Sequence, residues 1–129
     1  MNKEQLKKDM LEKKVWAVVG ATPSETKFGY KIYKKLKNRG YEVYAVNPNY
    51  DMVDGDTCYH DIPSLPKKPE CIDMVVPPAV SKDFLNQIEK AGIENVWFQP
   101  GTFDEETILL AKEKGLNIIY HDCVLVALG

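Results

Sequence analysis

The residues with the most evident chemical capacity lie between Gly20 and Gly29, in the segment GATPSETKFG. Gly20 allows a ligand close to the backbone, Thr22 and Ser24 carry hydroxyl groups, and Lys27 carries a positive charge. A helix beginning after this segment would add unpaired amides and about half a positive charge at its N-terminus. These features predict a phosphate-binding loop. The plainer alternative is a connection between two elements that binds nothing.

The segment does not match the glycine pattern of dinucleotide-binding proteins. That pattern needs three glycines within six positions and an acidic residue about twenty positions further along the chain. Here nine positions separate Gly20 from Gly29, and Asn47 stands where the acidic residue would be. An NAD(P)-dependent enzyme or redox sensor is therefore an alternative that the sequence disfavours. A partner subunit without a ligand is a second alternative.

Groups for acid–base or metal chemistry are sparse. His60 and His121 belong to no catalytic motif with a carboxylate or serine, so both are interpreted as structural. Cys58, Cys71 and Cys123 lack the spacing of metal ligands, and their odd number predicts free thiols in a reducing, cytoplasmic location. No catalytic residue is assigned. Cys123 is the sharpest candidate for a reactive group, because it follows the last predicted strand.

Short apolar runs alternate with segments of helical spacing along the chain. The run VWAVVG is nearly continuous, which is typical of a strand buried on both faces of a parallel sheet. Strands are predicted over residues 15–20, 41–46, 71–76, 95–98 and 116–120, with a weaker one over 57–60. Helices are predicted over residues 29–38, 81–91 and 104–114. This alternation predicts an α/β, Rossmann-like, doubly wound parallel sheet of five or six strands with helices on both faces.

The helix ends and the N-terminal segment carry further signals. Ser81 and Asp104 are predicted to be N-caps, because their side-chain oxygens can accept hydrogen bonds from the backbone amides of a first helical turn. Residues 1–14 alternate in charge and are predicted to form a charged helix ahead of one domain over residues 15–129. The packed side of that helix is predicted to carry Leu6, Met10 and Leu11.

The composition disfavours several classes of partner. A chain of 129 residues with 44% hydrophobic and 28% charged residues can fill one core. Its formal net charge of −2 gives no general attraction to nucleic acid or anionic lipid, and the N-terminal segment is too charged for a signal peptide or membrane span. Arg39 is the single arginine, so backbone amides, helix ends and lysines must hold any phosphate. The expected partner is a small molecule, and a homo-oligomer or a partner enzyme subunit stays open.

Turn-forming residues follow the predicted strands, and in such sheets ligands bind beyond the carboxyl ends, where the strand order reverses. These ends read GATPS, NPNY, PP, QPG and DC. With the segments between them, they resemble the small stand-alone coenzyme A-binding proteins related to the N-terminal domain of the succinyl-CoA synthetase alpha subunit. The resemblance covers nearly all of residues 15–126. It implies a Rossmann-like fold that binds coenzyme A or a short acyl-CoA.

The resemblance also implies which residues contact the coenzyme. The set comprises Gly20, Ala21, Thr22, Pro23, Ser24, Lys27, Asn47, Pro48, Asn49, Val76, Pro77, Pro78, Phe98, Gln99, Pro100 and Cys123. Cys123 is interpreted as a small residue closing the sheet, with a mixed disulfide to the coenzyme thiol as the alternative. Two positions depart from the family. Asn49 and Tyr50 stand where relatives commonly carry a lysine, and Val124 stands where the synthetase subunit has proline after the cysteine.

Overall fold

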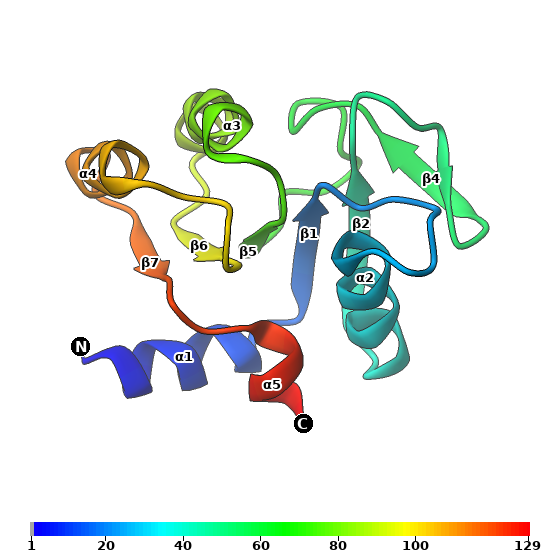
Figure 1. Ribbon diagram of the computed structural model, residues 1–129, viewed down its shortest axis with the longest axis horizontal. Coiled ribbons are helices and arrows are strands. Elements are labelled where there is room, and N and C mark those ends of the chain that lie inside the picture. Colours follow the sequence, from blue (N-terminus) through cyan, green and yellow to red (C-terminus); the bar gives the residue numbers. More distant parts are fainter. Residues whose placement is uncertain (1) are drawn as a thin grey trace.

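The computed structural model describes residues 2–129, which form a seven-stranded sheet with helices on both faces (Figure 1). The strands are β1 (Val15–Val19), β2 (Glu42–Val46), β3 (Met52–Val53), β4 (Asp56–Tyr59), β5 (Cys71–Met74), β6 (Asn95–Phe98) and β7 (Asn117–Ile119). The helices are α1 (Lys3–Glu12), α2 (Phe28–Asn38), α3 (Pro78–Ala91), α4 (Glu105–Glu113) and α5 (Val124–Leu128). The predicted Rossmann-like class is confirmed.

The strand order is β3-β4-β2-β1-β5-β6-β7, and neighbouring strands are parallel except for β3 and β4. From β1 the chain passes through α2 to β2 on one side, whereas β5 pairs with β1 on the other side. The order therefore reverses between β1 and β5, which is where such sheets hold ligands. The strand beyond the predicted five or six is β3, which has two residues and pairs antiparallel with β4.

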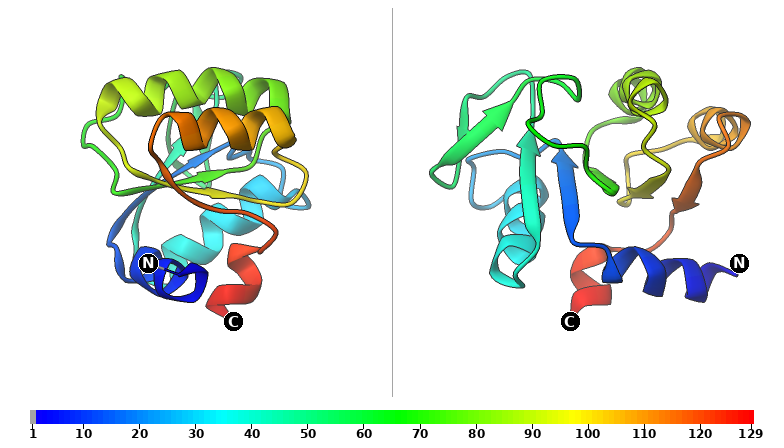
Figure 2. Two further views of the ribbon diagram at one scale, coloured as in Figure 1. Left: turned by 90° about the vertical axis from the view of Figure 1, so that its left-hand side faces the viewer. Right: turned by 180° about the vertical axis from the view of Figure 1, so that it is seen from behind.

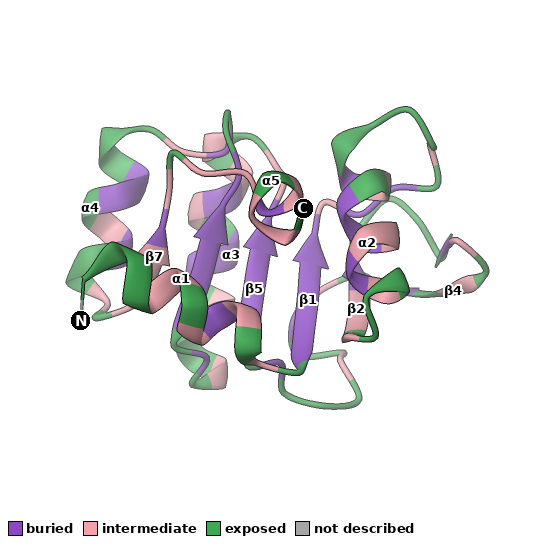
Figure 3. Cartoon of the chain, turned by 90° about the horizontal axis from the view of Figure 1, so that it is seen from below, coloured by how far each residue is buried: buried purple, intermediate pink, exposed green. Residues whose placement is uncertain are grey.

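Two hydrophobic clusters hold the helices to the sheet. On one face α1, α2 and α5 pack around Met10, Trp16 and Leu36. On the other face α3 and α4 pack around Leu85 and Ile88, and Figure 2 shows the two helical layers with the sheet between them. Every residue of β1 and β5 is buried, as the colours of Figure 3 show. Burial on both faces explains why these strands are apolar almost throughout.

The N-terminal helix packs on the same core as the sheet. Asn2 caps α1 by accepting the amide of Gln5 at 2.9 Å, and the side chain of Gln5 accepts the amide of Asn2 in return. Met10 is fully buried, and Leu6 and Leu11 pack against the same cluster. The predicted packed side of this helix is confirmed.

The start of α3 corrects a sequence prediction. Pro77 is the N-cap and Pro78 takes the first helical position, where the missing N–H of proline costs nothing. The prediction of Ser81 as N-cap is wrong, since the helix has already begun. Ser81 is buried, and its hydroxyl donates to the carbonyl oxygen of Thr102 at 2.7 Å. Asp104 is confirmed as an N-cap of α4 and accepts the amide of Thr107 at 2.8 Å.

Most other boundaries agree with the sequence prediction to within two residues, but one strand end and one added helix differ more clearly. The strand predicted over residues 71–76 ends at Met74. The amide of Val75 makes one further hydrogen bond, to the carbonyl oxygen of Val19, and the chain then turns into Pro77. The five-residue helix α5 follows Cys123 and is too short for helical spacing to reveal. Its Val124 is fully buried, and this residue anchors the helix to the core.

Candidate functional site

Three strand ends meet where the strand order reverses. The amide of Gly20 donates to the carbonyl oxygen of Val46 at 2.8 Å, which joins the end of β1 to the end of β2. The amide of Val75 donates to the carbonyl oxygen of Val19, also at 2.8 Å, which joins β5 to β1. The turns that follow β1, β2 and β5 therefore form one continuous rim.

Two glycines make this rim tight. Gly20 has a φ of +103°, and a Cβ there would lie 2.6 Å from the carbonyl oxygen of Val75. A Cβ on Gly29 would lie 2.1 Å from the carbonyl oxygen of Gly20. The turn after β1 therefore fits between the end of β5 and the first turn of α2 only because both positions lack a side chain.

The N-terminus of α2 is open toward the rim. Lys27 occupies the N-cap position, and its side chain makes no capping hydrogen bond. The amides of Phe28 and Gly29 have no intrahelical partner by helix geometry, and they lie at the positive end of the helix dipole. Thr22 is buried, and its hydroxyl accepts the amide of Ser24 at 3.3 Å. The turn thus presents main-chain donors and one lysine, which suits an anion.

The side chain of Asn47 ties two of the turns together. Its Nδ2 donates to the carbonyl oxygen of Ala21 at 2.9 Å, and its Oδ1 accepts the amide of Asn49 at 2.9 Å. Both ends of the side-chain amide are therefore bonded within the protein. Asn47 shapes the wall of the crevice.

The rim surrounds a cavity of about 400 Å³. Residues predicted from the sequence that line it are Gly20, Thr22, Lys27, Asn47, Pro48, Asn49, Val76 and Pro77. Further lining residues are Phe28, Gly29, Tyr50, Val75 and Val80, which are absent from the predicted set. Gly29 and Tyr50 lie next to the predicted turns in the sequence, and this adjacency is the only sequence feature that could have indicated their place in the cavity lining. Val80 reaches the cavity because α3 begins earlier than predicted.

The remaining predicted residues do not line this cavity. They are Ala21, Pro23, Ser24, Pro78, Phe98, Gln99, Pro100 and Cys123. Ala21 and Phe98 are fully buried in the core, whereas Pro100 is exposed. Cys123 is partly buried at the N-cap position of α5. Contact between these residues and a ligand stays a prediction from the resemblance.

Gln99 connects the centre of the sheet to α5. Its Nε2 donates to Oδ1 of Asp73 on β5 at 2.7 Å, and its Oε1 accepts the amide of Val124 at 3.2 Å. Asp73 is fully buried, and its Oδ2 has no hydrogen-bond partner among the described residues. Burial raises the pKa of Asp73 to about 8, and the bond from Gln99 opposes this rise. The signal for this group in the sequence is a charged residue inside the apolar run CIDMVV.

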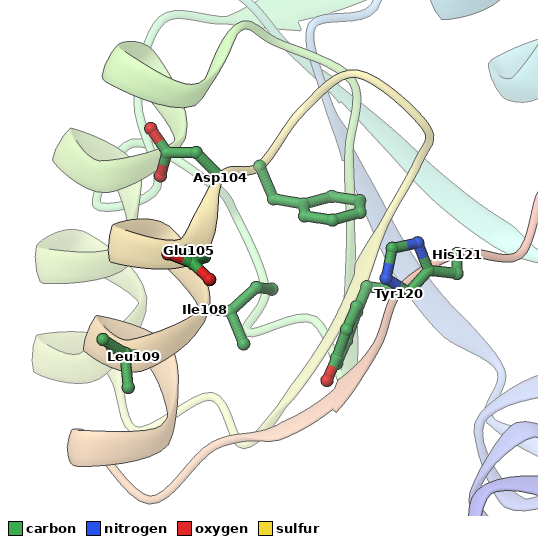
Figure 4. Close-up of a pocket in the computed structure, with 7 residues that line it drawn as sticks. Asp104, Glu105, Ile108, Leu109, Tyr120 and His121 are labelled. Atoms are coloured by element: carbon green, nitrogen blue, oxygen red, sulfur yellow. The ribbon is translucent and has the colours of Figure 1, made fainter.

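A second cavity, of about 420 Å³, lies between α4 and the segment after β7. Its lining includes Ile108 on α4 and Tyr120 and His121 after β7 (Figure 4). The carboxylates of Asp104 and Glu105 belong to the same lining and repel a phosphate. The cavity beside Gly20 is therefore the better site for a nucleotide.

Other reactive side chains form no second site in the part of the chain that is described. Residues 2–129 contain no group of three or more His, Cys, Asp or Glu side chains able to hold a metal ion. Burial raises the pKa of Cys58, and it raises the pKa of Cys71 to about 12. His60 pairs with Asp51 on the surface, with 2.8 Å between Nε2 and Oδ1. Within the same residues, every helix is too short or too polar to cross a membrane.

The fold is that of a doubly wound α/β domain, and its crevice lies where the strand order reverses, which is where such sheets bind ligands. Residues 14–129 match the family described as the CoA binding domain, and the chain belongs to that family. It is 33% identical over 124 residues to the ADP-forming acetate–CoA ligase I of Archaeoglobus fulgidus. That match covers 86% of this chain but 18% of the ligase, so the chain spans less than a fifth of this curated relative.

Small proteins match along most of their length. An uncharacterised protein of Bacillus subtilis is 25% identical, with 98% of this chain and 93% of that protein covered. The structure of a hypothetical protein from Pyrococcus horikoshii superposes with a TM-score of 0.89 at 33% identity, covering 98% of this chain and 89% of that one. The same domain therefore occurs both as part of a large ligase and in proteins of about this size.

Proposed function

We propose that this chain binds coenzyme A, or a short acyl-CoA, in the cavity beside Gly20. The observation that most supports this proposal is the turn after β1. Its two glycines allow a tight backbone there, and the start of α2, which has no side-chain cap, lies at the same cavity. In the proposed complex the pyrophosphate lies against the amides of Phe28 and Gly29, next to Lys27. Membership of the CoA binding domain family supports this choice of ligand.

The remaining walls of the cavity suit the other parts of the ligand. The ribose and base lie along Asn47 to Tyr50, because the ribose of a nucleotide faces the end of the second strand in this class of sheet. The pantetheine arm lies along Val76 and Pro77, whose side chains offer an apolar surface. Such an arrangement uses flat, uncharged walls for the long arm and reserves the polar turn for the pyrophosphate.

The ribose side of the cavity disfavours NAD as the ligand. Dinucleotide-binding sheets hold the ribose hydroxyls with a carboxylate at the end of the second strand. This chain has Asn47 there, and both ends of its side-chain amide are bonded within the protein. The lining residues from Asn47 to Tyr50 carry no carboxylate. A coenzyme gripped mainly through its pyrophosphate therefore fits the site better.

A thermal-unfolding series tests the proposal. A ligand present at about a hundred times its dissociation constant adds roughly 2.7 kcal/mol to the free energy of unfolding, which raises the midpoint by roughly 8 °C. Coenzyme A and acetyl-CoA are expected to produce such a rise, and NAD and NADP are expected to produce none. Stabilisation by NAD without stabilisation by coenzyme A would show that the proposal is wrong.

A matched pair of variants locates the site. Lys27→Gln removes the charge beside the open end of α2 and is expected to weaken coenzyme A binding roughly threefold to tenfold. Lys31→Gln makes the same change one helical turn later, at an exposed position outside the cavity lining, and is expected to leave binding unchanged. Equal effects of the two substitutions would place the ligand elsewhere.

A further inference from the structure

We infer that this site does not recognise the 3′-phosphate of the coenzyme, so that 3′-dephospho-CoA binds as tightly as coenzyme A. The inference rests on the proposed function and concerns the ribose side of the same cavity. It depends on which charges face the position of the ribose, at the end of β2. A phosphomonoester carries a charge of about −1.5 to −2 at neutral pH, so its recognition requires cations or directed donors.

The cavity offers a single cation for the whole ligand. Among the described residues that line it, Lys27 is the only charged side chain. Lys27 stands at the N-cap of α2, on the side where the pyrophosphate is proposed to lie. The segment that faces the ribose contributes Asn47, Pro48, Asn49 and Tyr50, and all four are uncharged.

The main-chain amides on that side and the side-chain amide of Asn47 are already engaged, and the donors that remain, the side-chain amide of Asn49 and the hydroxyl of Tyr50, are uncharged. The Nδ2 of Asn47 donates to the carbonyl oxygen of Ala21, and the amide of Asn49 donates back to Asn47. The amide of Tyr50 donates to the carbonyl oxygen of Asn47 at 3.4 Å. The turn after β2 is therefore closed on itself, unlike the open turn after β1.

Lysines further along α2 are also engaged elsewhere. The Nζ of Lys34 lies 2.9 Å from Oδ2 of Asp54, and the Nζ of Lys37 lies 3.0 Å from the same atom. Lys37 also pairs with Oδ2 of Asp56 at 2.7 Å. These contacts hold the hairpin of β3 and β4 against α2, and they compensate the lysine charges before any ligand arrives.

The first charged residue along the chain after the segment that faces the ribose is acidic. Asp51 follows Tyr50 directly, its side chain is 89% exposed, and its partner is His60. A carboxylate next in sequence to this wall offers no attraction to a second dianionic group. The ribose side is thus neutral within the cavity and acidic beside it, and a 3′-phosphate gains nothing there over its hydration in water.

Isothermal titration of the wild-type protein with coenzyme A and with 3′-dephospho-CoA tests the inference. The two dissociation constants are expected to agree within about twofold at low salt, with similar salt dependence, because the same single lysine serves both ligands. Coenzyme A binding more than tenfold tighter than its dephospho form would overturn the inference and leave the proposed function standing. Failure of both ligands to bind would overturn the proposed function itself.

A gain-of-charge variant supplies the second arm. Asn49→Lys places a cation on the ribose wall and is expected to favour coenzyme A over 3′-dephospho-CoA by about threefold to fivefold, as for an exposed ion pair. Asn49→Gln changes the side-chain length without the charge and is expected to keep the two affinities equal. An unchanged ratio in Asn49→Lys would overturn the assignment of the ribose phosphate to this wall.

Discussion

The carbonyl oxygen of Gly20 occupies the space that a Cβ of Gly29 would need, at a separation of 2.1 Å. This close approach brings the turn after β1 against the first turn of α2 and sets the shape of the rim around the cavity. No rotation of a side chain relieves the clash, because the obstructing atom belongs to the backbone.

Gly29→Ala is therefore expected to destabilise the protein by at least about 2 kcal/mol, although alanine is the better helix former. Urea unfolding measures the change in the free energy of unfolding. Gly115→Ala is the control, since its Cβ meets nothing within 4 Å and its cost of about 1 kcal/mol arises from the left-handed backbone alone. A Gly29→Ala protein as stable as wild type would show that the backbone can shift to make room for a Cβ at this position.

Asp73 is expected to make stability depend on pH. Its pKa is raised by burial to about 8 in the folded protein, against an ordinary value of 3.8. Between these values the folded state holds a proton that the unfolded state has released, so stability falls as pH rises from about 4 to about 8. Asp73→Asn removes this dependence and is expected to be more stable than wild type at pH 8 by about 2 to 5 kcal/mol, with a smaller difference at pH 5.

Urea unfolding of both proteins across that pH range checks the Asp73 prediction. The asparagine side chain retains an acceptor for Nε2 of Gln99, so the link to Val124 is expected to persist. Parallel stability curves for wild type and Asp73→Asn would show that Asp73 is ionised in the folded protein at neutral pH.

Ser81 is expected to behave as a buried hydrogen-bond donor. Its hydroxyl reaches the carbonyl oxygen of Thr102 at 2.7 Å and joins α3 to the loop before α4. Ser81→Ala is therefore expected to cost about 1 to 2 kcal/mol, because it leaves a buried carbonyl oxygen without this donor. The free energy of unfolding measures the loss, and Ser64→Ala, at an exposed serine, provides the comparison. A negligible cost would mean that another donor replaces the hydroxyl.

Ser81 also illustrates where sequence reasoning succeeds and where it fails. The strand in VWAVVG and the cap at Asp104 depend on local pattern, and both are present in the structure. Ser81 has the right residue type for a cap, but the prolines before it start the helix earlier, and proline at the first helical position is itself a local signal. The Asp54-Gly55 pair is likewise a hairpin signal that points to the overlooked β3.

Features of the site that depend on tertiary contacts could not be predicted in the same way. Eight of the proposed residues line one cavity, because parallel strands bring the turns at their carboxyl ends to the same edge of the sheet. The engagement of Asn47 with Ala21 and the link from Asp73 to Gln99 join positions 26 residues apart in each case. Nothing in the local pattern indicates which buried polar groups will meet across such a separation.

The ion pairs of Asp54 are expected to hold the hairpin of β3 and β4 in a single conformation against α2. Its pKa is lowered to about 2, first by the hydrogen bond from Lys34 and next by that from Lys37. The carboxylate therefore stabilises the fold at neutral pH, and this contribution is lost as pH falls from about 4 through 2. Asp54→Asn keeps a residue that tolerates the left-handed φ of 52° but removes the charge.

Hydrogen exchange checks the Asp54 prediction. Amides of residues 49–60 are expected to exchange faster in Asp54→Asn than in wild type at neutral pH, while those of β1 and β5 stay protected. Asp51→Asn, at the exposed partner of His60, serves as the control and is expected to leave exchange in α2 and the hairpin unchanged. Wild-type exchange in Asp54→Asn would show that the ion pairs do not hold the hairpin.

The three cysteines are expected to differ in reactivity. Cys58 and Cys71 are buried, and burial raises the pKa of both thiols, which disfavours the reactive thiolate at each. Cys123 is only partly buried. Brief alkylation of the folded protein followed by peptide mass measurement is expected to find the label on Cys123. Label on Cys71 at early times would indicate that the sheet opens on the time scale of the reaction.

The two cavities are encoded by separate stretches of the chain. All described residues lining the first lie between positions 20 and 80, and those lining the second lie between positions 103 and 121. Recombination with a homologue at a junction inside α3 would thus exchange one cavity and preserve the other. The cavity beside α4 can therefore vary between homologues or designed chimeras while the turn after Gly20 is inherited unchanged.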